Sequence, residues 1–356
     1  MREERRPPRE ETEEVAPGVL RIQLPISLPG LGHVNCYAIE DRMGITLVDP
    51  GLPGLPTYRA LKKQMAAAGM PIYRVHTVVI THSHPDHFGQ AATLHRKFGA
   101  EIVTHKRFRT FLDPEAEADD EEVETTTSVD EAKASVHGDR PTANSPFERN
   151  TPWGGQRHQL PLARRLRYQA MRVATGKFMS TPQPTKRVDE ADVITIGDRE
   201  WVSVYTPGHT PDHLCLMDVD NGVMISGDHI LPTITPHISG MGATIDPLAD
   251  FFESLDRMQA YNSVSTVLPA HGLEFSDLAG RAKAIRTHHE ERLTILQDAS
   301  DEIGNGTVND YMKALFKERS WGSMAESETY AHLEHLRLNG DAAVTIDDAQ
   351  LRYELR

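Results

Sequence analysis

Cysteine is scarce in this 356-residue chain, which contains only Cys36 and Cys215, both in apolar, strand-like runs. Two such cysteines exclude a disulfide framework and indicate buried packing residues. Long apolar runs are also lacking, and no apolar stretch follows the charged residues 1–8. We therefore expect no secretory signal, no membrane partner and a cytoplasmic location.

A basic excess is missing as well, since the formal net charge is -14 at pH 7. A general nucleic-acid binder ordinarily has a basic balance, so no DNA partner is expected, although a local basic patch remains compatible with this charge. No serine or cysteine stands out as a nucleophile. We therefore expect the reaction to depend on other residue types.

Histidines gather in the segment THSHPDH at residues 81–87, directly after an apolar, β-branched run. Alternate residues of an extended chain share a face, so His82 and His84 can converge on one ion. The following turn brings Asp86 and His87 toward a second ion. A solvated, histidine-rich turn is the alternative, but matching residues later in the chain favour a metal site.

Three later segments repeat the pattern of an apolar run that ends in a turn with a histidine or an aspartate. They are residues 201–205 before His209, 223–226 before Asp228, and 266–268 before His271. The order HxHxDH, His, Gly-Asp, His resembles the metallo-β-lactamase superfamily over roughly residues 17–275.

The resemblance implies a centre for two divalent metal ions. One ion would be held by His82, His84 and His209, the other by Asp86, His87 and His271, and Asp228 would bridge the two. These ligand types suit zinc, with iron or manganese as alternatives. Two ions can lower the pKa of a shared water from about 15.7 toward 7 and so supply hydroxide as the nucleophile. Asp86 and Asp228 are therefore the expected catalytic residues.

Three residues beside this centre are candidates for supporting it or for contacting substrate. Asp49 ends the predicted strand 44–48, where it either orients a ligand or forms a turn. His213 supports His209 or contacts substrate, or else it is a structural histidine of the next strand. His229 follows Asp228, and its side chain is expected on the opposite face, where it either contacts substrate or is a packing residue. His237 is interpreted as a surface or packing residue.

The predicted fold is α/β, because strands alternate with helices, and the resemblance implies an αββα sandwich with the metals at one edge. A solvated tail is expected over residues 1–15 and the metallo-β-lactamase domain over 16–275. Residues 276–356 predict three helices and a hairpin, which resemble a winged helix. This tail has ten basic against fifteen acidic residues, so packing on the core or in a homodimer is expected in place of DNA binding.

An insertion of about 106–189 interrupts the domain. It contains a basic amphipathic stretch with Arg164 and Arg165. One interpretation is a solvated helical insertion. The other is a lid whose arginines meet an anionic small-molecule substrate, such as a coenzyme-A thioester.

These observations predict a dinuclear metal-dependent hydrolase acting on a thioester, ester or lactone. Glyoxalase II-like relatives use the same His and Asp set on thioesters, and the GDHIL run at 227–231 resembles the subgroup with a C-terminal winged helix. A phosphodiesterase or ribonuclease is the alternative enzyme, and a non-enzymatic winged-helix regulator is the alternative outside enzymes. A β-lactamase proper is not expected, because the exported location is missing.

Overall fold

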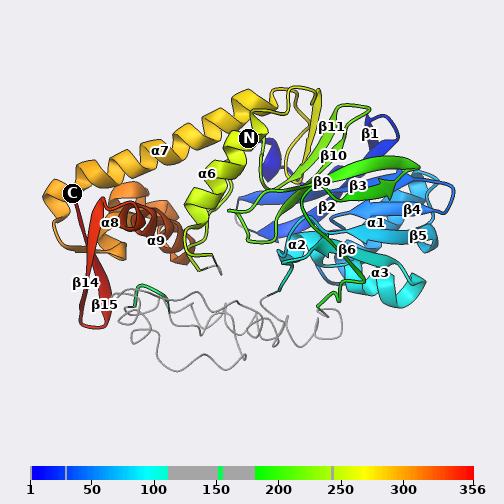
Figure 1. The fold of residues 1–356 in the computed structure, drawn as a ribbon. Helices are drawn as coiled ribbons and strands as arrows, with labels where there is room; N and C mark the ends of the chain where they lie inside the picture. The colour runs from blue at the N-terminus through cyan, green and yellow to red at the C-terminus, as the bar shows by residue number, and fades with distance from the viewer. Residues whose placement is uncertain (1, 29, 111–150, 155–180, 242–243) are drawn as a thin grey trace.

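The computed structural model of the protein describes residues 2–28, 30–110, 151–154, 181–241 and 244–356. Two β-sheets pack face to face, helices cover their outer faces, and a helical unit lies beside them (Figure 1). The expected αββα sandwich is confirmed. None of the helices in this part of the chain has the length and apolar character needed to cross a bilayer.

The first sheet has its seven strands in sequence order. They are β1 (Glu13–Ala16), β2 (Val19–Leu28), β3 (Leu31–Glu40), β4 (Ile45–Val48), β5 (Val75–Val79), β6 (Glu101–His105) and β7 (Lys186–Val188). Strands β1 to β4 pair antiparallel, and β4 to β7 pair parallel. Because parallel strands end at the same edge, the segments after β4 and β5 lie together. Strand β7 also shows that residues 186–188 of the expected insertion belong to this sheet.

The second sheet has five strands in the order β12-β11-β10-β9-β8. They are β8 (Val193–Ile196), β9 (Arg199–Tyr205), β10 (Leu214–Asp218), β11 (Val223–Gly227) and β12 (Thr266–Pro269). Only the β11–β12 pair is parallel. The runs that carry His209, Asp228 and His271 are therefore the ends of β9, β11 and β12.

Strand periodicity places the apolar side chains in three layers. Cys36 packs under the helices of the first sheet, whereas its neighbour Tyr37 lies between the sheets. Cys215 faces the helices of the second sheet, whereas Leu216 lies between the sheets. Sheets covered on both faces need nearly continuous apolar strands, which explains the runs seen in the sequence.

Helices cover both sheets. On the first sheet lie α1 (Leu55–Ala67), the short α2 (Pro85–Phe88) and α3 (Ala91–Phe98), with a 3-10 turn η2 (Ile72–Arg74), and on the second lies α6 (Pro247–Met258). Gly89 and Gln90 separate α2 from α3. A Cβ on Gly89 would lie 2.1 Å from the backbone nitrogen of Pro53, so this position accommodates a close approach of two backbones.

The C-terminal unit contains the predicted three helices and hairpin. Its elements are α7 (Leu278–Ile303), β13 (Gly306–Thr307), α8 (Val308–Leu315), η3 (Glu318–Ser320), α9 (Ser323–Leu338), β14 (Ala342–Asp347) and β15 (Gln350–Leu355). Helices α7 and α9 both pack on α6 of the sandwich. The likeness to a winged helix stays a prediction.

A short piece of the expected insertion also belongs to this unit. Trp153 is buried among the side chains of α7, α8, α9 and the hairpin. The backbone N–H of Leu351 donates to the carbonyl of Trp153 at 3.0 Å, and Gly154 forms a bridge with Gln350.

The N-terminal residues differ from the solvated tail expected over 1–15. Residues Glu3–Arg5 form the 3-10 helix η1, and Glu13–Ala16 form β1. Glu4 is buried, and its carboxylate accepts a hydrogen bond from Thr233 Oγ1 at 2.6 Å. Most of the other described residues up to 15 are exposed or half-buried. The charged composition gave no sign of the two elements, because backbone pairing with β2 needs no apolar side chains.

Candidate metal centre

Strand ends from both sheets meet at one edge of the sandwich. Strands β4 and β5 contribute the turn after Val48 and the segment 81–87, and β9, β11 and β12 contribute one metal-ligating candidate each. The side chains form two groups whose ligand atoms lie within 4.8 Å of one another: His82, His84, His209 and Asp228, and Asp86, His87 and His271. All seven predicted ligands are thus brought together.

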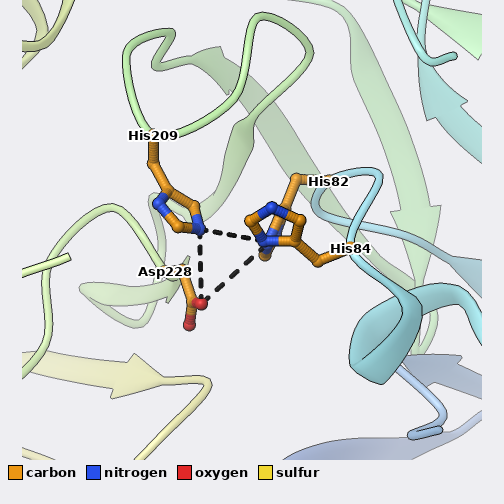
Figure 2. Close-up of side chains that lie close together, drawn as sticks. All are labelled: His82, His84, His209 and Asp228. Atoms are coloured by element: carbon orange, nitrogen blue, oxygen red, sulfur yellow. Dashed lines mark hydrogen bonds and ion pairs between the residues drawn. The ribbon is translucent and has the colours of Figure 1, made fainter. Parts of the chain in front are cut away.

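In the first group, three imidazoles and a carboxylate point toward a common centre (Figure 2). His84 Nδ1 lies 3.0 Å from His82 Nε2 and 3.1 Å from His209 Nε2. Asp228 Oδ2 lies 3.5 Å from His209 Nε2 and 3.9 Å from His82 Nε2. Three ring nitrogens that face one another in a buried site are an arrangement that a metal ion satisfies.

In the second group, the separations are wider than hydrogen bonds. His87 Nε2 lies 3.6 Å from Asp86 Oδ2 and 3.6 Å from Asp228 Oδ2. His271 Nε2 lies 3.7 Å from Asp86 Oδ2 and 3.4 Å from Asp228 Oδ1. Ligands about 2.0–2.1 Å from a tetrahedral zinc ion are roughly 3.4 Å apart, so the spacing fits an ion between them.

Unpaired atoms in this group support the same fit. Within the described part of the chain, His87 Nε2, His271 Nε2 and Asp228 Oδ1 are buried and have no hydrogen-bond partner. A buried polar atom without a partner costs free energy, so such atoms occur where a ligand or ion completes them. Here the unpaired atoms are the ones that would bind metal.

The opposite ring nitrogens are hydrogen-bonded, which fixes how each imidazole is oriented. The Nδ1 contacts are His209 to the His237 carbonyl at 2.7 Å, His271 to the His33 carbonyl at 2.8 Å, and His87 to Asp49 Oδ2 at 2.8 Å. An Nδ1–H that donates to oxygen leaves Nε2 as the metal-facing atom, which is the usual arrangement in metal-binding histidines.

Asp49 connects several of these side chains. Its carboxylate accepts hydrogen bonds from the Thr81 backbone N–H at 2.9 Å and from Thr81 Oγ1 at 2.7 Å, in addition to His87 Nδ1. Thr81 Oγ1 in turn lies 3.0 Å from His82 Nδ1. The backbone at Asp49 has φ 54, a left-handed conformation that aspartate adopts more readily than most residues. The structure thus places Asp49 where it can orient ligands of both groups.

The pKa shifts of His87 and Asp228 indicate that this site stabilises added positive charge. Burial opposes protonation of His87, but the carboxylates of Asp86, Asp49 and Asp228 outweigh it and hold the pKa of His87 well above its ordinary value. Burial also opposes ionisation of Asp228, but the neighbouring His271 and His87 hold the pKa of that carboxyl well below its ordinary range. A divalent cation can take the place of the proton that these carboxylates attract.

Two imidazoles of the first group, His82 and His84, have pKa values that favour the neutral form. Burial is the main reason that the pKa values of His82 and His84 lie well below the ordinary histidine value, and the neighbouring imidazoles lower them further. Neutral imidazole is the form that binds a metal, so no proton has to be displaced from these two rings.

The remaining candidate residues have different surroundings in the structure. His213 is buried, its Nε2 accepts a hydrogen bond from the Asp228 backbone N–H at 3.0 Å, and its Nδ1 lies 2.7 Å from Thr206 Oγ1. It therefore holds the backbone of Asp228. His229 is buried, and its ring packs perpendicular to that of Phe251 of α6 at 5.3 Å between centroids. Arg164 and Arg165 lie outside the described residues.

Several supporting residues were missed from the sequence. His237 and His33 orient metal-facing imidazoles through backbone carbonyls, which every residue type carries, so no sequence signal marks them. Ser83 Oγ donates to Asp212 Oδ1 at 2.9 Å and ties the histidine segment to the loop that carries His209. Thr81 could have been found, because it lies inside the motif at 81–87.

The comparison with family models agrees with this geometry. The model of the metallo-β-lactamase superfamily matches residues 29–271, which include all seven candidate ligands. The match covers more than half of the chain, so the protein belongs to the metallo-β-lactamase superfamily.

The individual relatives have low sequence identity to this chain. The chain is 25% identical over 201 residues to the uncharacterized protein YobT of Bacillus subtilis (strain 168), covering 56% of this chain and 63% of YobT. It is 26% identical over 260 residues to the probable metallo-hydrolase YqjP of the same strain, covering 71% of each protein. It is also 27% identical over 109 residues to an atrochrysone carboxyl ACP thioesterase of Cryptosporiopsis sp. (strain 8999), covering 30% of this chain and 31% of the thioesterase.

A solved structure shows the same fold over nearly the whole chain. A metallo-β-lactamase family protein from Thermus thermophilus superposes with a TM-score of 0.73 at 25% identity, covering 96% of this chain and 99% of that one. The likeness therefore includes the C-terminal unit as well as the sandwich.

Proposed function

We propose that the protein is a dinuclear metal-dependent hydrolase that cleaves a thioester, ester or lactone of a small molecule. The observation that supports it best is the pair of ligand groups joined at Asp228, with buried, unpaired ligand atoms between them. Zinc is the proposed metal, because imidazole and carboxylate ligands suit it, and iron or manganese would fit the same donors.

Two bound divalent ions would lower the pKa of a water toward neutrality and polarise the substrate carbonyl. The chain's own residues prepare the site for this chemistry. Asp228 stays ionised and faces both groups, so it balances charge between them. Asp86 completes the second group with its Oδ2 within 3.7 Å of both facing nitrogens. Hydrolysis should therefore depend on both aspartates.

Two observations support an acyl substrate. One relative is named as an acyl-carrier-protein thioesterase, although its match covers only part of either chain. The net charge of -14 also disfavours a nucleic-acid substrate, because a negative surface repels a long phosphate backbone. A phosphodiesterase or ribonuclease uses the same type of centre and is the alternative that the assay has to separate.

The test combines metal analysis with two assays. Elemental analysis of the gently purified chain should give close to two transition-metal ions per chain. The loaded enzyme should hydrolyse acyl-coenzyme A or aryl thioesters, with activity lost in Asp86→Asn, and should leave single-stranded RNA and bis(p-nitrophenyl) phosphate nearly untouched. A metal-free chain with full activity would remove the proposal. RNA cleavage that depends on His84, without thioesterase activity, would favour the nuclease.

A further inference from the structure

The loop between β11 and α6 supplies the carbonyl that orients His209. Its described residues are 228–241 and 244–246, and the carbonyl of His237 accepts the hydrogen bond from His209 Nδ1 at 2.7 Å. This carbonyl lies outside the two sheets, in contrast to the carbonyl of His33, which lies in strand β3. The orientation of His209 therefore depends on what holds this loop.

Helix α9 of the C-terminal unit contacts the loop at three of its residues. His237 Nδ1 lies 3.3 Å from Glu328 Oε2, Ser239 Oγ lies 3.0 Å from Ser327 Oγ, and the Gly240 N–H donates to the Ser327 carbonyl at 3.2 Å. The packing is close, since a Cβ on Gly240 would lie 2.5 Å from the Tyr330 ring. The loop therefore rests directly on α9.

Glu328 is itself fixed in place. It is 8% exposed, and its second oxygen, Oε1, accepts a hydrogen bond from Arg292 of α7. Burial works against ionisation, but the hydrogen bond from His237 and the charge of Arg292 outweigh it and lower the pKa of Glu328 to about 2. A buried carboxylate paired on both oxygens is costly to disturb, because removing one partner leaves the other unsatisfied.

We propose that Glu328 is a positioning residue for the metal centre, through which the C-terminal helices fix His237 and thereby the metal-facing imidazole of His209. The inference rests on the proposed function, because it requires that the first group holds a metal ion. It assigns to α7 and α9 a part in metal binding, although neither helix contributes a ligand. The simpler role for Glu328 would be to attach α9 to the sandwich, with no effect on the metal.

Metal affinity of the full-length chain distinguishes the two roles. The main variant is Glu328→Gln, which keeps the shape and removes the charge, and its matched control is Glu334→Gln on the same helix. Glu334 is also buried, and it accepts hydrogen bonds from Tyr353 of the hairpin and from Arg337 of α9. Zn²⁺ affinity is measured by competition with a chromogenic chelator, and thermal unfolding of each metal-free variant reports stability.

Glu328→Gln should weaken one of two metal positions about 10-fold, the lower end of the range for residues that orient a ligand, and leave the other unchanged. Cobalt substitution should show the same loss as a changed absorption spectrum for one ion. Glu334→Gln should bind both ions with wild-type affinity even where it unfolds at a similarly reduced temperature. Equal metal loss in both variants, or wild-type affinity in Glu328→Gln, would overturn the inference.

A double-mutant cycle adds a test that does not depend on a single variant. His237→Ala removes the ring but keeps the carbonyl. If Glu328 acts through that ring, the double variant should bind metal no more weakly than His237→Ala alone. Additive losses would contradict the proposed route. A wild-type chain that binds no metal would overturn the proposed function together with this inference, whereas full wild-type loading with an unaffected Glu328→Gln would overturn this inference alone.

Discussion

The two ligand groups differ in what holds their histidines. In the second group, His87 is oriented by Asp49 at the end of β4, and His271 by a carbonyl of β3. Both supports belong to the first sheet. In the first group, His209 is oriented by a loop carbonyl whose loop rests on α9. The supports of His87 and His271 are thus built by the sandwich alone, whereas one histidine of the first group, His209, depends on a unit added after the sandwich.

This difference shows that the protein need not hold the orientation of every ligand imidazole equally firmly. An imidazole supported by a sheet loses its orientation only if the core is disturbed, because strands are packed on both faces. An imidazole supported by a loop loses it when any contact beneath the loop changes. The two metal positions should therefore respond differently to the same kind of substitution.

The largest effect is expected from removing Asp228, the ligand that both groups share. Its loss should weaken both metal positions alike. Asp228→Ala takes away the carboxylate that faces both groups, so both metal affinities should fall by about 100-fold or more and hydrolysis should be lost. Asp228→Asn should give a smaller loss at both positions, because the amide can still donate a lone pair but carries no charge. Isothermal titration with Zn²⁺ measures this. Retention of two ions in Asp228→Ala would show that the carboxylate is not the bridge.

Removing a ligand that belongs to only one group should deplete only the metal ion of that group. His84→Ala should deplete the first ion and His271→Ala the second, each leaving about one ion per chain by elemental analysis. The reason is that each ring faces only its own group. A loss of both ions from either variant would mean that the two positions are filled cooperatively.

An intermediate effect is expected at the support of the second group. Asp49→Asn should weaken metal binding by about 10-fold to 100-fold, chiefly at the second position, because His87 loses a charged acceptor. The control is Asp41→Asn, which accepts hydrogen bonds in the turn at the opposite end of β4. Asp41→Asn should bind metal normally. Competition titrations of the two variants decide it, and equal affinities would contradict the role of Asp49.

The smallest effect on metal binding is expected at Asp212, where stability should change instead. Burial raises the pKa of Asp212 to about 6. A raised pKa favours the folded state at low pH, so the metal-free chain should lose up to about 3 kcal/mol of stability as pH rises from about 4 through 6. Asp212→Asn keeps the acceptor for Ser83 and should lack this loss. Denaturant unfolding at pH 4 and pH 8 tests it, and parallel pH profiles would contradict it.

The sequence predicted most of the sandwich and all seven residues of the candidate centre, because both depend on local patterns. Apolar runs mark strands buried on two faces, and a histidine or aspartate directly after such a run must lie at a sheet edge. His229 shows the limit of this reasoning, since periodicity placed it on the opposite face but could not reveal that Phe251 covers it.

The parts that could not be predicted depend on backbone groups and on contacts between distant segments. The carbonyls of His33 and His237 would be available on any residue, so their role left no trace in the side chains. The pairing of residues 13–16 with β2 was hidden by charge, because strand pairing uses backbone hydrogen bonds. Glu328 is separated from His237 by 91 residues, and no local pattern links them.

Trp153 has a practical consequence for anyone who wishes to divide this protein. Its side chain fills the interior of the C-terminal unit, and its carbonyl pairs with the edge of β15, yet it precedes that unit by more than a hundred residues. A fragment cut at residue 276 would carry a hole in its interior and an uncovered strand edge, both of which favour aggregation. Exchange of the C-terminal unit between relatives should therefore transfer residues 151–154 along with it.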